Sequence, residues 1–554
     1  MSGSAKIEKI RNSFGENVQL ESIPEGAPHI ICSNGTFAGK IRDDIEIYRG
    51  VPFACQPVGN LRWKAPQSAP DCGDIFSAYY NGKSPIQTEW GTELASYYRQ
   101  GEDCLCLNIW MKTQPVFHEV RPVMVFFHGG SYGWGGTADP MYDGFNFVSK
   151  HPDVILITVG YRTGLLGFVD LSSVKGGEEF PDSANLGILD QIEALRWINR
   201  NCAAFGGDDE NITIFGESAG GGSASLLPII PAAKGLFRRS IVESGSVALT
   251  YSRKQCREFT RKLLELSGAS SMDDLCALSE DELKRINEEL NDYNNFPMRD
   301  GKLIPEDPYE PYRNGTASDV DMLIGTNKDE ANYWVGEIGG IIGFRFGIPV
   351  KFENDLEKLS IRDRRRVHEF MKTRKSHSIW RMSEFYTEML FRLPAICQAE
   401  GHSANNGRTY MYFWEKPSAI RYHGACHAVE LAYVFGNTEE TLYTGEMADV
   451  SISDMVMQMW VNFAKCGDPS VEGISWPLYD PENRSTMIIT DNSYVENDPY
   501  GNYRILLSPM LKRMISPSYT GLNLNVPFVL RVIVLGGIIV GALVLLLLKL
   551  LEVF

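Results

Sequence analysis

The chain has 554 residues, 44% of them hydrophobic and 22% charged, with a formal net charge of −17. This is the composition of a globular protein with enough apolar residues to build a large core. So acidic a chain lacks the basic field that phosphate backbones require, which excludes nucleic acid as the main partner. The charge balance fits an enzyme that acts on neutral or cationic small molecules.

The N-terminal part predicts no export signal and one small antiparallel element. Residues 1–19 are polar and charged, without the basic segment and following apolar segment of a signal peptide. Short strand-like segments then follow the turn residues Asn34 and Gly35. We expect residues 35–54 to form an antiparallel hairpin that joins a larger sheet.

Five short segments further along have the length and composition of buried strands. They are residues 123–127, 154–159, 212–215, 322–324 and 409–414. Helical periodicity is found between and after them, at 189–201 and 454–465. This alternation predicts an α/β fold with a mostly parallel central sheet flanked by helices. We expect one catalytic domain over residues 1–515.

The C-terminal end is strongly apolar. From 532 to 548 every residue is apolar or glycine, close to the roughly 20 residues that cross a bilayer. This predicts a transmembrane helix at 528–549, preceded by a linker at 516–527. Gly537 and Gly541 in this segment have a spacing that is compatible with helix pairing, and hence with a homodimer.

Charges around the apolar segment predict its orientation. Lys512, Arg513 and Arg531 all lie on its N-terminal side, and positive charge tends to stay in the cytoplasm. Only five residues follow Lys549. The sequence therefore predicts a single-pass tail anchor that holds the catalytic domain at the cytoplasmic side of a membrane.

Gly216, Ser218 and Gly220 form a Gly-x-Ser-x-Gly motif between the strand expected at 212–215 and a small-residue helix expected at 219–227. The glycines permit a sharp strand-to-helix turn that leaves the serine exposed at the end of the strand. The helix N-terminus also places partial positive charge near developing negative charge. In this context the motif predicts a nucleophilic serine; a plain glycine-rich turn is the alternative.

A serine nucleophile needs a base, and the base needs an acid that orients it. In this type of fold the acid and then the histidine follow the serine along the chain. His368, His377 and His402 lie in charged or polar segments, so we expect them at the surface. His423 and His427 precede an apolar segment, and local sequence alone does not decide between them.

The sequence also contains a candidate oxyanion hole, which needs backbone N–H groups aimed at the developing oxyanion. Residues 128–131, His-Gly-Gly-Ser, follow the strand expected at 123–127, where a hydrolase of this type carries that loop. Two donors from the loop and the N–H of Ala219 would complete the hole.

Residues 205–220 match the active-site signature of the type-B carboxylesterase/cholinesterase family at every specified position. Further matching segments are residues 48–54, 102–105, 161–168 and 187–191. The chain thus resembles this family over roughly residues 25 to 510. The resemblance implies an α/β-hydrolase fold and a serine esterase that needs neither a cofactor nor a metal.

The resemblance also implies which residues complete a triad with Ser218. The segment that ends at Glu330 looks like the family's acid segment, which implies Glu330 rather than Asp329 as the acid. The segment that begins at His427 is similar to the family's histidine segment, which implies His427 rather than His423 as the base.

Further expectations follow from the family. The oxyanion donors it implies are Gly130, Ser131 and Ala219, with Ser131 in place of a glycine that is usual there. Since the donor is a backbone N–H, this substitution need not disable the hole. Two structural ion pairs are implied as well, Arg162 with Asp190 and Arg62 with Glu102.

Some features of the family's secreted and choline-hydrolysing members are missing. Cys104 finds no cysteine partner at residues 81–87, and Cys276 finds none about ten residues upstream. The absence of both bridges agrees with a reducing compartment. Leu94 stands near the place of the tryptophan that holds choline in cholinesterases, with Trp90 only nearby, so a choline site is not predicted.

The sequence therefore predicts two-step acyl transfer from a small-molecule ester to water through acyl-Ser218. One alternative is an amidase or peptidase on the same fold, because the same chemistry cleaves amides. A second is a non-catalytic, adhesion-type binding protein. The presence of Ser218, Glu330 and His427 together argues against that second alternative.

Overall fold

The structure is a computed structural model that describes residues 15–87, 99–113, 120–290, 295–337, 340–373 and 378–511. Within these residues the centre of the molecule is an eleven-stranded sheet. Its strands, in spatial order, are β17 (Tyr494–Asn497), β16 (Ser485–Ile489), β15 (Thr409–Trp414), β14 (Asp321–Asn327), β11 (Arg239–Glu243), β10 (Gly207–Glu217), β8 (Arg121–Phe127), β9 (Ile155–Val159), β7 (Cys106–Lys112), β5 (Ile45–Pro52) and β4 (Lys40–Arg42).

The seven neighbouring strands from β16 to β9 are parallel. Antiparallel strands complete the sheet at both edges. All five predicted strands are confirmed, and the predicted N-terminal hairpin is β4 with β5. Smaller sheets are formed by β1 (Gln19–Leu20), β6 (Ile75–Ser77), β3 (Gly35–Ala38) and β2 (His29–Cys32), and by β12 (Tyr251–Ser252) with β13 (Met298–Arg299).

Helices cover both faces of the sheet. One face packs against α4 (Leu186–Asn201), α5 (Ala219–Leu226) and α14 (Leu393–Ser403). The other packs against α2 (Phe145–Lys150), α15 (Leu431–Val434) and α16 (Val450–Cys466). The predicted helices at 189–201 and 454–465 lie inside α4 and α16. The parallel strands are buried on both faces, which explains why they read as continuous apolar runs.

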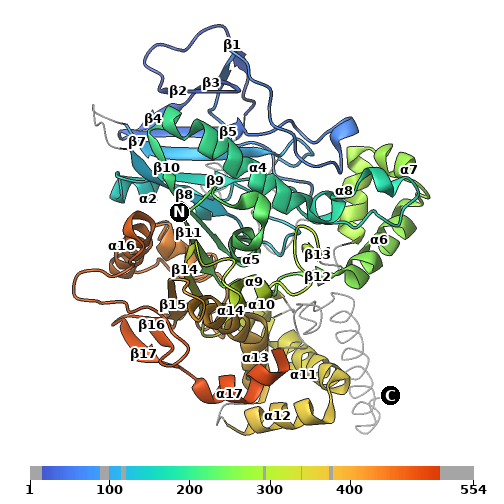
Figure 1. The fold of residues 1–554 in the computed structure, drawn as a ribbon, viewed down its shortest axis with the longest axis vertical. Helices are drawn as coiled ribbons and strands as arrows, with labels where there is room; N and C mark the ends of the chain where they lie inside the picture. Colours follow the sequence, from blue (N-terminus) through green and yellow to red (C-terminus); the bar gives the residue numbers. More distant parts are fainter. Residues whose placement is uncertain are drawn as a thin grey trace, which may run out of the picture.

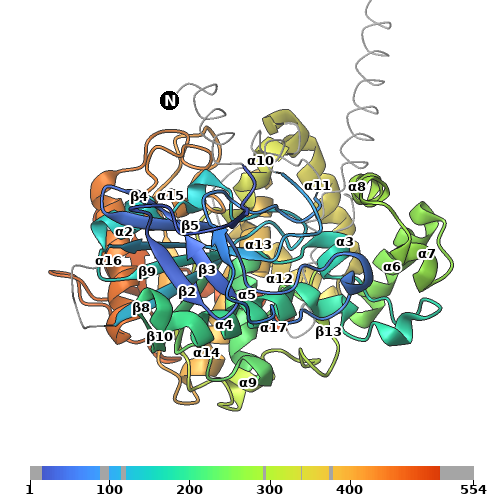
Figure 2. The same cartoon turned by 90° about the horizontal axis from the view of Figure 1, so that it is seen from above.

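The remaining helices lie around this core. They are α3 (Gly164–Gly167), α6 (Arg253–Ser267), α7 (Met272–Cys276), α8 (Glu280–Glu289), α9 (Glu310–Arg313), α10 (Trp334–Glu337), α11 (Gly340–Lys358), α12 (Ile361–Lys372), α13 (Ser378–Thr387) and α17 (Gly501–Leu511). Figure 1 shows α12 and α17 at the end of the molecule opposite β2 and β3. In Figure 2, α6 and α7 lie on the side opposite α16.

Both ion pairs that the family resemblance implies are present. Arg162 Nη2 lies 2.6 Å from Asp190 Oδ1, and Arg62 Nε lies 2.5 Å from Glu102 Oε2. All four side chains are buried, so each guanidinium is compensated inside the protein. These contacts support the fold and take no part in the chemistry below.

The prediction of a C-terminal membrane anchor is corrected. In the part of the chain that the structure describes, no helix combines the length and apolar character needed to cross a bilayer. The predicted linker at 516–527, the helix at 528–549 and the Gly537–Gly541 basis for a homodimer lie outside the described residues. An apolar sequence of sufficient length does not by itself establish a spanning helix. The transmembrane helix, the tail anchor and the cytoplasmic orientation inferred from it are therefore withdrawn.

Candidate active site

Ser218 occupies a one-residue turn between strand β10 and helix α5. The strand ends at Glu217 and the helix begins at Ala219. Ser218 has φ 56° and ψ −117°, a backbone conformation that is strained for any residue with a side chain. In the segment 212–227 it is flanked by buried residues and is itself only half-buried. The turn therefore lifts one hydroxyl out of an otherwise buried segment.

The two glycines of the motif are required by close packing. A Cβ on Gly220 would lie 1.9 Å from the carbonyl oxygen of Phe127, and a Cβ on Gly216 would lie 2.5 Å from the carbonyl carbon of Gly220. Helix α5 consequently packs directly against the ends of β8 and β10. This close approach is the reason that the sequence motif needs glycine on both sides of the serine.

Glu330 and His427 are brought together from distant parts of the chain. Glu330 begins the short 3-10 helix η9 (Glu330–Tyr333) after β14, and His427 lies in the loop before α15. Glu330 Oε2 and His427 Nδ1 are 2.6 Å apart, a short hydrogen bond. The other oxygen, Oε1, accepts a hydrogen bond of 2.8 Å from the backbone N–H of Asn327. Both oxygens of the fully buried acid are thus fixed.

The other candidates for acid and base have different environments. Asp329 Oδ2 accepts a hydrogen bond from the backbone N–H of Ala425 at 3.0 Å. His423 is half-buried and His368 is exposed, while His377 lies outside the described residues. The expectation that His402 lies at the surface is wrong. It is 1% exposed, and its Nδ1 lies 2.8 Å from Thr409 Oγ1. The reason is that the C-terminal end of α14, which carries His402, packs against β15.

The second imidazole nitrogen of His427 faces a residue that the sequence analysis did not assign. Glu217 Oε1 lies 3.1 Å from Nε2. Within the described residues, Ser218 Oγ forms no hydrogen bond with His427. The structure therefore places Ser218 directly beside a residue that contacts the histidine, without the serine–histidine hydrogen bond itself. Catalytic hydrogen bonds of this kind often tighten only when substrate binds.

The carboxyl groups around His427 determine its electrostatics. Burial disfavours the imidazolium, but the charges of Glu217, Glu330 and Glu430, with the hydrogen bond that His427 donates to Glu330, raise the pKa of His427 to about 9. Burial is also the main reason that the pKa values of Glu217 and Glu430 are raised. A sequence signal for both glutamates was present, because Glu217 directly precedes Ser218 and Glu430 follows His427 by three residues.

Aromatic side chains form a wall beside the histidine. The ring of Trp334 stacks on His427 with a centroid distance of 5.6 Å and an interplanar angle of 25°. Phe391 and Tyr333 lie at 4.9 Å and 6.1 Å. These apolar faces exclude water from the imidazole and strengthen its interactions with the carboxyl groups. The sequence motifs do not include them: Tyr333 and Trp334 follow the acid segment that ends at Glu330, and Phe391 lies about 60 residues further along the chain.

The predicted oxyanion loop follows β8 and contacts the nucleophile. A Cβ on Gly129 would lie 3.3 Å from the Cβ of Ser218. Gly130 and Ser131 have φ 103° and 52°, and their backbone N–H groups donate no hydrogen bond within the described residues. Ala219 is the first residue of α5, where helical N–H groups lack intrahelical partners. The loop and the helix end thus bring three predicted donors to the surroundings of Ser218.

We expect Gly130→Ala to lower kcat by roughly 10²- to 10³-fold, the loss measured when one oxyanion donor is displaced. Its Cβ would lie 2.2 Å from the carbonyl oxygen of Trp134, so the loop has to move. Ser131→Gly is the matched control, since it keeps the N–H and suits the positive φ; we expect kcat within about threefold of wild type. Steady-state kinetics on enzymes with matching circular dichroism measures both. Equal effects of the two substitutions would contradict this assignment.

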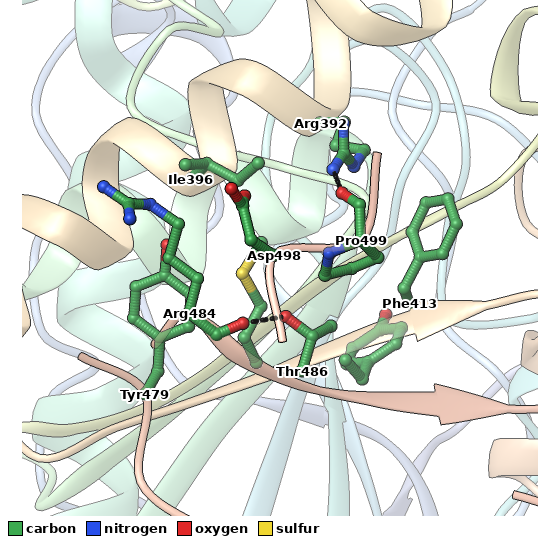
Figure 3. A pocket seen from close by; sticks show the side chains of 10 residues that line it. Arg392, Ile396, Phe413, Tyr479, Arg484, Thr486, Asp498 and Pro499 are labelled. Atoms are coloured by element: carbon green, nitrogen blue, oxygen red, sulfur yellow. Dashed lines mark hydrogen bonds between the residues drawn. The ribbon is translucent and has the colours of Figure 1, made fainter. Parts of the chain in front are cut away.

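A small cavity beside β15 is separate from the candidate active site. It is lined in part by Arg392, Tyr479, Arg484 and Asp498, and Figure 3 shows these side chains around it. Its charged groups are already compensated: Arg392 pairs with Glu388, Arg484 with Glu400 and Asp498 with Arg504. None of the predicted triad residues lines this cavity, so it offers no acyl-transfer chemistry.

Comparisons with known proteins agree with this geometry. The family model described as "Carboxylesterase family" matches residues 26–503. Para-nitrobenzyl esterase of Bacillus subtilis (strain 168) is 35% identical over 499 residues, 86% of this chain and 97% of that protein. Liver carboxylesterase of Sus scrofa is 30% identical over 561 residues, covering 85% and 91%. The crystal structure of Geobacillus stearothermophilus carboxylesterase EST55 has a TM-score of 0.77 at 30% identity, covering 86% and 99% of the two chains. The fold is accordingly the α/β-hydrolase fold.

Trp90 and Leu94, on which the argument against a choline site rested, lie outside the described residues.

Proposed function

This chain belongs to the carboxylesterase family and is a carboxylic-ester hydrolase of the serine type, and we propose that Ser218, His427 and Glu330 carry out its chemistry. The observation that carries the proposal is the 2.6 Å hydrogen bond between Glu330 and His427, beside a strained turn that exposes Ser218. A nucleophile, a base and an acid that orients the base are the three parts that acyl transfer requires.

In the first half of the reaction, Ser218 Oγ attacks the ester carbonyl carbon while His427 Nε2 accepts the hydroxyl proton. The backbone N–H groups of Gly130, Ser131 and Ala219 stabilise the oxyanion of the tetrahedral intermediate. His427 then donates the proton to the leaving alcohol, and the acyl group stays on Ser218. Water repeats the sequence in the second half and releases the acid.

Glu330 has two tasks in this scheme. Its hydrogen bond to Nδ1 leaves Nε2 of His427 as the nitrogen that accepts the proton from Ser218. Its charge stabilises the imidazolium that forms during each proton transfer. Glu217, 3.1 Å from Nε2, supplies further negative charge at the nitrogen that becomes protonated.

The substrate we propose is a neutral small-molecule ester. The relatives named above are esterases, so an amidase or a non-catalytic binding protein is not favoured. For the Bacillus relative, the name itself points to p-nitrobenzyl esters, and these are a suitable first substrate here. A panel that varies the acyl group and the alcohol separately would define which side of the ester the aromatic wall selects.

An organophosphonate probe tests the nucleophile directly, because it reacts only with an activated serine. We expect the probe to add once to the wild-type enzyme and peptide mapping to locate the adduct on Ser218. Labelling should stop in the unfolded protein, where no base is held near the serine. An adduct at another serine would contradict the assignment.

The pH dependence follows from the shift at His427. The base must be neutral to accept a proton, so kcat/KM should rise as pH increases and His427 loses its proton. Because the pKa of His427 is raised, this rising part of the pH profile, its acid limb, should be centred above pH 6.5. Glu217→Gln removes a negative charge that favours the imidazolium. We expect its acid limb to move to lower pH by roughly one unit. A limb that stays in place, measured under identical ionic strength, would show that Glu217 does not act on His427.

A further inference from the structure

Four neighbouring parallel strands direct a row of side chains toward α16. Phe215, Ile241, Leu323 and Tyr410 pair in register across β10, β11, β14 and β15, and they pack with α16 in one apolar cluster. Side chains alternate along a strand, so the same face recurs two residues later. The next row toward the carboxyl ends of the strands is therefore also directed toward α16.

This next row is polar. It consists of Glu217, Glu243, Gly325 and Tyr412, which pair across the same four strands. A Cβ on Gly325 would lie 2.1 Å from Cδ1 of Tyr412, so the tyrosine ring covers the glycine. The Trp460 side chain of α16 covers this row, and the centroid of its ring lies 5.4 Å from that of the Tyr412 ring. Polar groups are thus sealed inside the protein, directly beneath His427 and its partners.

Glu243 is the most enclosed acid of this row. Its exposed fraction is 0%, and its Oε1 accepts a hydrogen bond of 2.7 Å from the indole N–H of Trp460. Within the described residues, Glu243 Oε2 and the Tyr412 hydroxyl have no hydrogen-bond partner. A buried carboxyl oxygen with no donor is costly if the group is ionised, whereas a protonated oxygen is itself a donor.

The charges around Glu243 are of one sign. The groups that act on it electrostatically are Glu430 and Glu217, while Tyr412 contributes only a neutral hydroxyl. In the described part of the chain no lysine or arginine forms an ion pair with Glu217, Glu243, Glu330 or Glu430. His427 is the one cation that pairs with them there. Burial, and then the charge of Glu430, raise the pKa of Glu243 well above its ordinary value.

Two carboxyl groups neighbour Glu243, and they differ in the donors they already have. Glu430 accepts hydrogen bonds from the Asn327 amide and, at 3.4 Å, from the Ser244 hydroxyl. The Glu217 carboxyl accepts no hydrogen bond within the described residues; its contact with His427 is an ion pair. Glu217 and Glu243 are paired residues on adjacent strands. Glu217 is therefore the carboxylate that lacks a donor.

We propose that Glu243 is a neutral carboxylic acid that donates its proton in a hydrogen bond to Glu217, and so acts as a positioning residue for His427. The donated hydrogen bond stabilises the Glu217 carboxylate, which in turn stabilises the imidazolium that forms when Ser218 is deprotonated. Glu243 touches no reacting atom. This inference rests on the proposed role of His427 as the base.

Glu243→Gln tests the charge state, because an amide is neutral, similar in shape and still a donor. If Glu243 is a neutral acid, Glu243→Gln should keep kcat/KM within about threefold and leave the acid limb in place. Under the same conditions, Glu217→Gln should shift the acid limb of kcat/KM to lower pH. A downward shift of the limb in Glu243→Gln would mean that the substitution removed a negative charge, and would overturn the proposal.

Infrared spectroscopy of the resting enzyme gives a second readout that needs no turnover. At neutral pH the wild type should show the carbonyl stretch of a protonated carboxylic acid, and Glu243→Gln should lose it. An unchanged band in that variant overturns the proposal. The band is measured equally well in Ser218→Ala, so a failure of the proposed triad and a failure of this inference are distinguishable.

Glu243→Met completes the series by removing the donor. Without it the Glu217 carboxylate is less stable, and we expect the acid limb to move down as in Glu217→Gln. If the acid limb of Glu243→Met instead coincides with that of Glu243→Gln, the donor has no effect on His427, and the positioning role is refuted.

Discussion

Ser218→Ala is expected to lower kcat for a p-nitrobenzyl ester by about 10⁵-fold while the fold stays intact. The hydroxyl is the group that forms the covalent bond, and no neighbouring side chain replaces it in the turn between β10 and α5. Removal of Oγ also lessens crowding at a strained position, so the thermal midpoint should not fall. Single-turnover kinetics with an excess of enzyme would also show that the burst of alcohol release is lost.

Ser225→Ala is the matched control for this experiment. Ser225 lies on the same helix and is buried, where its Oγ accepts a hydrogen bond of 3.1 Å from Gln398. Its replacement should cost about 1 kcal/mol of stability and leave kcat within a few-fold of wild type. The assignment of Ser218 as nucleophile fails if Ser218→Ala keeps more than a small fraction of the wild-type rate.

Glu330→Gln is expected to lower kcat by about 10⁴-fold. The amide is uncharged, so it does not stabilise the imidazolium, and its NH₂ group favours the wrong tautomer of His427 when it faces Nδ1. The substitution preserves the size of the side chain, so circular dichroism and the thermal midpoint should change little. Full pH profiles are needed, because the weaker partner also lowers the pKa of the base.

Asp329→Asn provides the comparison, because it alters the adjacent acid. Asp329 Oδ2 accepts a backbone hydrogen bond from Ala425, whereas the hydrogen bond to His427 Nδ1 is accepted by Glu330. We expect kcat to fall by less than about tenfold, since only the loop that carries His427 is affected. Comparable losses in the two variants would argue against Glu330 as the acid that orients the base.

The sequence was sufficient to predict the parts of the site that depend on local backbone geometry. The glycines around Ser218 and the loop that follows β8 have local signatures, because a sharp turn or a close approach restricts the residue type. Burial on both faces likewise makes the central strands visible as apolar runs. Strand β11 was not predicted, since Arg239 and Glu243 place charges at both of its ends.

Other features depend on contacts that no local pattern encodes. The choice of Glu330 over Asp329 required the family resemblance, because neighbouring carboxylates look alike until the register of β14 and the path of the loop at His427 are known. The polar row beneath the site emerges only when four strands are aligned. His402 was assigned to the surface because its neighbours are polar, but α14 turns it toward β15. The membrane anchor was inferred from hydropathy alone, and no spanning helix is found in the described residues.

The aromatic wall beside His427 has a consequence for how this enzyme can diversify. Trp334 and Phe391 come from helices between β14 and β15, whereas Ser218 sits at the end of β10. Ser218 and His427 thus lie outside the stretch that shapes the surroundings of the base, and Glu330 lies at the start of that stretch. Exchange of the helical insert that follows Glu330 between related enzymes should therefore transfer substrate preference as a module, with the reactive machinery left in place.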